Sequence, residues 1–157
     1  MKPPLLSARR RSASCWVSDG PGLAAGSFVW TMFPFGPPDP TDLPGPVRHV
    51  DYILGRNGAG SAIVAYSSSG PWQGDPPPLG IIQFDRAAAE VLGQRPFHLD
   101  LRCLALMPCT QAWFPELGRP GHGVLGVAGV RLRSRIQTVL DSLVLRSPRV
   151  IQLRGPC

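Results

Sequence analysis

The sequence lacks a long apolar run. Hydrophobic residues make up 43% of its 157 residues, but Gly, Pro or charge interrupts every stretch before the roughly 20 apolar residues that a membrane-spanning helix needs. The start of the chain is basic but has no apolar segment of about 7–15 residues, so we do not expect a secretory signal. The chain is also too short for two ordinary domains. We therefore expect one small cytoplasmic domain without a membrane partner.

Motifs of the commoner enzyme classes are missing as well. There is no phosphate-binding Gly loop with a Lys, no serine nucleophile elbow, and no HExxH or CxxC ligand set. The four cysteines, Cys15, Cys103, Cys109 and Cys157, have no metal-like spacing, so we interpret them as core or surface residues rather than as a metal site or a disulfide framework. The sequence predicts no metal and no cofactor.

The net charge of +6 comes from the two ends of the chain. Lys2 and arginines 9–11 lie near the start, and several arginines lie between Arg131 and Arg154. A basic surface attracts nucleic acid by neutralising phosphates. An arginine-rich helix face can equally be plain solvated surface, so the charge leaves the partner open.

Composition divides the chain near Met32. Residues 1–31 mix Pro, Ser, Arg and Gly without a period, and we predict a disordered basic leader there, or a start assigned too far upstream with Met32 as the alternative initiator. Residues 32–157 are expected to form the domain. The Pro-rich segment from Met32 to Pro46 is interpreted as an extended arm or a long loop packed by Phe33 and Phe35.

Strand and helix patterns fill the rest of the domain. The predicted elements are a hairpin of residues 49–55 and 61–69, a short strand at 79–84, a short helix at 85–93, a long strand at 95–108 with a bulge near Cys103, and a helix at 130–146. Short strands joined by Gly/Pro-rich loops and closed by one helix favour a β-barrel. The expected fold class is mainly β with one or two helices.

Three segments, taken in order, resemble the PemK/MazF family of toxins from bacterial type II toxin-antitoxin systems. They are PGPVRHVDYIL followed by SAIVAYSSS, then LGQRPFHLDLRCLALMPCTQAWF, then LRSRIQTVLDSLVL. Together they cover about residues 33–145. The resemblance implies an SH3-like β-barrel that forms a homodimer, cleaves single-stranded RNA without metal by 2′-hydroxyl attack, and is neutralised by a cognate antitoxin protein.

The resemblance also assigns site residues. The family has an Arg, often followed by Pro, at the start of its second strand, and this Arg corresponds to Arg48. A Thr/Ser-Ser pair that ends the next strand falls within Ser67, Ser68 and Ser69, which makes Ser68 and Ser69 catalytic candidates and Ser67 an RNA contact. Here His49 replaces the Pro, Ser replaces the Thr, and the Pro-rich arm replaces an early strand with acidic or aromatic residues.

RNA cleavage by a 2′-hydroxyl needs several chemical roles, which can be matched to these residues. Attack by a 2′-hydroxyl needs a proton acceptor, a group that stabilises charge on the phosphorane oxygens, and a proton for the leaving oxygen. Arg48 suits the second role because its guanidinium matches phosphate oxygens. His49, with an ordinary pKa of about 6.5, is our hypothesis for the acid and base work, although neighbours on a strand point to opposite faces.

Other residues receive simpler predictions. Trp72, in a loop, and Arg56, at the hairpin turn, are expected RNA contacts, since an aromatic ring stacks on unpaired bases. Trp113 is expected in the core, His98 half-buried in a strand, and His122 in a loop.

Each candidate site residue also has an interpretation without a catalytic or binding role. Arg48 can be a solvated cation, His49 a surface residue at a turn edge, and the serine run an ordinary strand end. The predicted function is a single-stranded-RNA endonuclease. A non-catalytic barrel that binds RNA or protein, or an interaction domain without a nucleic-acid role, would fit the same sequence.

Overall fold

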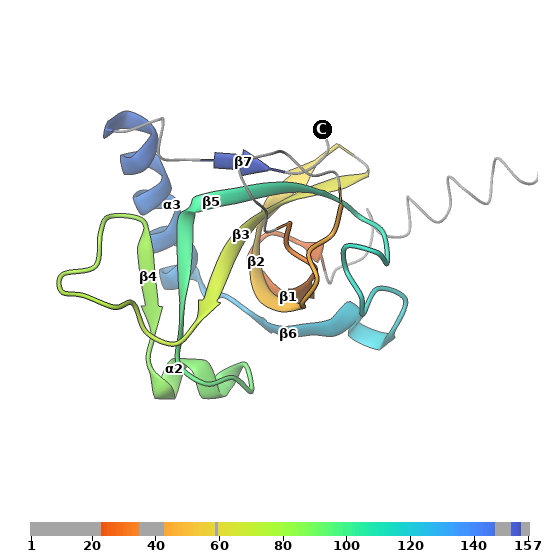
Figure 1. The fold of residues 1–157 in the computed structure, drawn as a ribbon, viewed down its shortest axis with the longest axis horizontal. Helices are drawn as coiled ribbons and strands as arrows, with labels where there is room; N and C mark the ends of the chain where they lie inside the picture. The colour runs from red at the N-terminus through yellow and green to blue at the C-terminus, as the bar shows by residue number, and fades with distance from the viewer. Residues whose placement is uncertain (1–22, 35–42, 59, 147–151, 155–157) are drawn as a thin grey trace, which may run out of the picture.

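A computed structural model describes residues 23–34, 43–58, 60–146 and 152–154, which form a bent sheet flanked by helices (Figure 1). The strands are β1 (Ser27–Thr31), β2 (His49–Asn57), β3 (Ser61–Ser69), β4 (Ile81–Phe84), β5 (Phe97–Pro108), β6 (Val124–Val127) and β7 (Gln152–Arg154). The helices are α2 (Arg86–Val91), the short 3-10 helix η2 (Pro120–Gly123) and α3 (Val130–Arg146). The strand order is β4-β5-β3-β2-β1-β6, and β7 pairs with β5.

The sheet has the shape of a half-barrel. Its pairings are antiparallel apart from the parallel pair of β5 and β7, and the central strands curve around β1 (Figure 1). The expected fold class is confirmed: the chain is mainly β, a small barrel-like sheet with a helix towards the C-terminus. None of the described helices is long and apolar enough to cross a membrane.

The predicted hairpin is confirmed as β2 and β3. Their pairing closes at Asn57 opposite Ser61, and Gly58 takes a φ of 67° in the turn, where a residue without Cβ is favoured. Because the two strands are antiparallel, the start of β2 lies beside the end of β3. This hairpin brings Arg48 and the serine run to the same end of the sheet.

The predicted bulge in the long strand is also confirmed. Ala65 of β3 pairs with Leu104, but the next residue, Tyr66, pairs with Asp100, so three residues of β5 have no partner on β3. Such an interruption bends a strand, and β5 turns sharply in its middle (Figure 1). The bend lets one strand serve two cores, with Leu99 on one side and Met107 on the other.

Both predicted helices form. The side chain of Asp85 caps α2 by accepting a hydrogen bond from the backbone N of Ala88 at 2.9 Å, which satisfies one of the free N–H groups of the first turn. Gly93, with a φ of 69°, follows the helix end. In α3, Ile136 and Leu143 face the core and the other side chains are partly or fully exposed.

Two hydrophobic cores stabilise the domain. The larger lies between the sheet, α2 and α3 and is centred on buried residues Phe28, Tyr52, Ile82, Phe84, Phe97, Leu99, Leu101 and Ile136. The second lies inside the curve of the sheet and contains Leu23, Val29, Phe33, Ile53, Val64, Met107, Trp113, Phe114 and Leu117. Trp113 and Phe33 are buried as predicted, while Phe35 lies outside the described residues.

The expected boundary at Met32 is wrong. β1 occupies residues 27–31 and pairs with both β2 and β6, so the folded domain includes residues assigned to the leader. Leu23, Phe28 and Val29 are at most 2% exposed. The prediction for residues 1–22 lies outside the described part of the chain.

Candidate functional site

An open cavity of about 840 Å³ lies where β2 begins and β3 ends. The segment between α2 and β5 forms its other wall. Its lining residues are Trp30, Val47, Arg48, His49, Val50, Ser67, Ser69, Gly70, Pro71, Gly93, Gln94, Arg95, Pro96 and Phe97. Four of the residues predicted from the sequence, Arg48, His49, Ser67 and Ser69, therefore line the same cavity.

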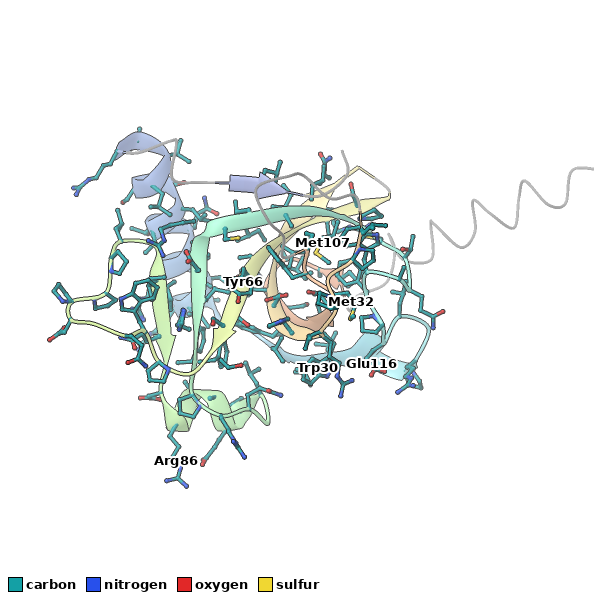
Figure 2. All side chains as sticks on the ribbon, viewed as in Figure 1. Trp30, Met32, Tyr66, Arg86, Met107 and Glu116 are labelled. Carbon is teal, nitrogen blue, oxygen red and sulfur yellow. The ribbon has the colours of Figure 1, made fainter. Side chains whose placement is uncertain are left out.

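Arg48 is held in place by two groups distant in the sequence. Its guanidinium lies over the Trp30 ring, 4.3 Å from the ring centroid, and its Nη1 donates to Oε1 of Glu116 at 3.2 Å. Figure 2 shows Trp30 and Glu116 near each other, as expected because Arg48 contacts both. The side chain of Arg48 is still 53% exposed, so a phosphate can approach it.

Glu116 itself is fixed by its loop. Its Oε2 pairs with Nη1 of Arg119 at 2.7 Å, and only 15% of the side chain is exposed. Gly123 makes room for it: a Cβ there would lie 2.3 Å from the Glu116 Cβ, and the φ of Gly123 is 71°. The glycine-rich loop thus positions a carboxylate beside Arg48.

His49 lines the cavity and contacts β3. Its ring lies 5.7 Å from the Tyr66 ring, centroid to centroid, and the Tyr66 phenol is hydrogen-bonded to the side chain of Ser68. Burial lowers the pKa of His49 below its ordinary value of about 6.5. A neutral imidazole, able to accept a proton, is therefore the main form at neutral pH.

The three serines have different surroundings. Ser67 is buried; its hydroxyl donates to the carbonyl of Val50 and its backbone N to Oδ1 of Asp51 at 2.7 Å. Ser69 is exposed and lines the cavity. Since side chains alternate along a strand, Ser68 points away from both, towards Tyr66. Of the two predicted catalytic serines, Ser69 is at the cavity and Ser68 is not among its lining residues.

A buried carboxyl group lies behind this wall. Asp51 is fully buried and accepts hydrogen bonds from Oγ1 of Thr31 at 2.5 Å and from the backbone N of Ser67 at 2.7 Å. Burial raises its pKa to about 7, against the opposing effect of these hydrogen bonds. Asp51 was not predicted as a site residue, although an acid within an apolar β2 segment is a signal for a buried, hydrogen-bonded carboxyl group.

Two predicted RNA contacts lie elsewhere. Nε of Arg56 is 3.5 Å from the carbonyl of Ser61 at the hairpin turn, at the opposite end of β2 from the cavity. The Trp72 ring packs edge-on against His98, at 5.5 Å between centroids, and the Arg102 guanidinium lies 5.3 Å from its centroid. Neither Arg56 nor Trp72 lines the cavity.

Arg95 is a charged cavity residue that was not predicted from the sequence. It is exposed and forms no ion pair within the described residues. Together with Arg48 it gives the cavity two cations, and no carboxylate is among the described lining residues. The predicted half-buried His98 is 9% exposed, with Nδ1 2.9 Å from the carbonyl of Gly70.

The cavity combines groups suited to a phosphodiester. Guanidinium groups complement phosphate oxygens, the half-buried Trp30 adds aromatic surface, and His49, whose ring packs against Tyr66, is the lining residue with an imidazole that can accept a proton. The described residues contain no cluster of three or more His, Cys, Asp or Glu side chains suited to a metal ion. In comparisons with known proteins, no family model, curated protein or solved structure matches the chain.

Proposed function

We propose that the chain is an endoribonuclease that cleaves single-stranded RNA at this cavity. The observation that carries the proposal is that Arg48 and Ser69 line one cavity to which His49 also contributes; the His49 ring itself packs against Tyr66, the residue towards which Ser68 points. Arg48, His49 and Ser69 supply a cation for phosphate oxygens, a proton acceptor and a hydroxyl donor. The resemblance to PemK/MazF toxins points to the same chemistry and the same strand ends.

The reaction is a transesterification. The ribose 2′-oxygen attacks the adjacent phosphorus while His49 accepts its proton, and Arg48 stabilises the negative charge on the non-bridging oxygens. Ser69 donates a hydrogen bond to one of these oxygens. The bond from phosphorus to the 5′-oxygen breaks, the 5′-oxygen takes a proton from water, the hydroxide left behind takes the proton from His49, and a cyclic 2′,3′-phosphate remains.

A non-catalytic RNA-binding module is the second candidate. It is favoured by the pairing of Arg48 with Glu116 and by the Ser67 hydroxyl, which already donates to Val50. The expected partners, a cognate antitoxin and a second copy of the chain, stay predictions, as does the cytoplasmic location.

The test uses the full chain and an end-labelled single-stranded RNA in EDTA. After the cut position is mapped, the same RNA is made with one 2′-deoxynucleotide on the 5′ side of that position. We expect discrete cuts with cyclic phosphate ends, and no cut in the deoxy RNA although it binds equally well. Cutting of the deoxy RNA would contradict 2′-hydroxyl attack, and salt-sensitive binding without any cutting would favour the binding module.

A further inference from the structure

A second, smaller cavity lies between β2 and the first turns of α3. Its volume is about 250 Å³, and it is lined by Ala25, Tyr52, Leu54, Arg133, Ser134, Ile136 and Gln137. None of these residues lines the cavity at Arg48. The two cavities are therefore lined by separate sets of residues.

Tyr52 provides a buried hydroxyl group at this cavity. The residue is 3% exposed, and its ring packs against Phe28, 5.0 Å between centroids. Within the part of the chain that the structure describes, its hydroxyl makes no hydrogen bond. A buried polar group without a partner destabilises the fold, so it usually has a bound water or ligand.

Arg133 brings positive charge to the same place. Burial raises the pKa of the Tyr52 phenol, and the charge of Arg133 opposes this rise, so the guanidinium lies within electrostatic reach of the hydroxyl. The Arg133 side chain passes over Gly26, where a Cβ would lie 3.1 Å from its Cδ. Arg133 has no ion-pair partner among the described residues.

The remaining polar lining completes a donor-rich pocket. Ser134 adds a hydroxyl, whereas Nε2 of Gln137 already donates to Asp141 at 2.9 Å. No carboxylate is among the described lining residues. A cation would be repelled by Arg133, and an apolar ligand would leave the Tyr52 hydroxyl unpaired. A small oxyanion satisfies both groups.

We propose that this cavity binds a phosphate-like oxyanion through the Tyr52 hydroxyl and the Arg133 guanidinium. The group is either free phosphate or a phosphate of a bound RNA backbone. The proposal does not depend on RNA cleavage at the first cavity, because it rests on a separate set of residues.

The first arm of the test measures free phosphate. The melting temperature of the full chain is followed while inorganic phosphate replaces chloride at constant ionic strength. Tyr52→Phe and Arg133→Gln are compared with Arg131→Gln, which removes the same charge from the same helix but lies off the cavity. We expect phosphate affinity to fall about 10-fold or more in Arg133→Gln and about 2–10-fold in Tyr52→Phe, with Arg131→Gln unchanged.

The second arm measures RNA binding by fluorescence anisotropy in a phosphate-free buffer. If RNA is the source, Arg133→Gln and Tyr52→Phe weaken RNA binding more than Arg131→Gln does. Either selective loss supports the site. The proposal is overturned if neither phosphate nor RNA distinguishes Arg133→Gln from Arg131→Gln, which would leave water as the partner of Tyr52.

Discussion

The guanidinium of Arg48 lies 4.3 Å from the centroid of the Trp30 ring, so a residue just before β2 is oriented by a residue of β1. Such a cation–π contact is worth about 0.5–1 kcal/mol at exposed sites. The ring limits the positions available to the guanidinium, and Glu116 limits them further. Arg48 is thus held at the edge of the cavity, with about half of its side chain still exposed to solvent.

Under the proposed function, RNA has to compete with Glu116 for Arg48. Glu116→Gln keeps the size of the side chain but removes a negative charge beside the cavity, so we expect RNA affinity to rise about 2–5-fold. Fluorescence anisotropy at low salt measures the change. Glu90→Gln is the matched control, because Glu90 also pairs with an arginine but on α2. An equal effect of both variants would contradict the competition.

The pKa of Asp51 predicts how stability depends on pH. Because burial raises it to about 7 in the folded protein, compared with about 4 in the unfolded chain, the folded state holds the proton more tightly. Between these values only the unfolded state is deprotonated, so the free energy of unfolding falls as pH rises from about 4 to 7. We expect this group to contribute a loss on the order of 2–4 kcal/mol.

Asp51→Asn isolates this contribution. Asparagine can still accept from the Ser67 N–H and can donate to Thr31, while it carries no charge. Its stability should lack the fall seen in the wild type, as measured by urea unfolding at several pH values. The lowered pKa of His49 makes the free energy of unfolding rise with pH instead. This contribution is the same in the wild type and in Asp51→Asn, so it cancels when the two proteins are compared. Parallel pH curves would show that Asp51 does not titrate in this range.

The lowered pKa of His49 predicts how the rate of RNA cleavage depends on pH. If its neutral form accepts the 2′-hydroxyl proton, the rate rises with pH up to its lowered pKa and is flat above about pH 6.5. His49→Gln should reduce the rate about 100-fold or more while retaining RNA binding. Asp51→Asn is the control for the neighbouring acid and should keep the profile. A profile that follows Asp51 instead would remove His49 from the mechanism.

A chain that starts at Met32 is expected not to fold. It lacks β1, which pairs with β2 and β6, and it loses Leu23, Phe28 and Val29 from the cores. Exposed core residues and an unpaired β2 edge should abolish cooperative thermal unfolding. Circular dichroism compares it with a chain that starts at Leu23, which we expect to melt cooperatively. Cooperative melting of the Met32 chain would contradict the role of β1.

Local patterns were enough to predict most of the fold. Alternating apolar residues identified the hairpin, and Asp85 marked the start of a helix through its capping side chain. β1 was missed because its five residues follow a stretch of Gly and Ala, and its strand conformation depends on two partners that are distant in sequence. The short β6 and β7 depend on tertiary pairing in the same way.

The candidate site was only partly predictable. Arg48 and Ser69 could be placed together because the ends of a hairpin meet, whatever the details of the loops. Trp30, Glu116 and Arg95 come from other elements, and nothing in their local sequence indicates that they approach Arg48. The strand register decides which face of the sheet Ser68 and Ser69 occupy. A run of identical serines does not specify that register.

The most direct test of the account compares RNA cleavage by Arg48→Gln and Arg86→Gln in EDTA at equal enzyme concentration. Both variants remove one guanidinium that pairs with a glutamate, but Arg86 lies on α2, far from Trp30 and Glu116 (Figure 2). We predict that Arg48→Gln cuts about 100-fold or more slowly than the wild type while Arg86→Gln is unchanged. Equal rates for the two variants would show that this cavity is not where RNA is cleaved.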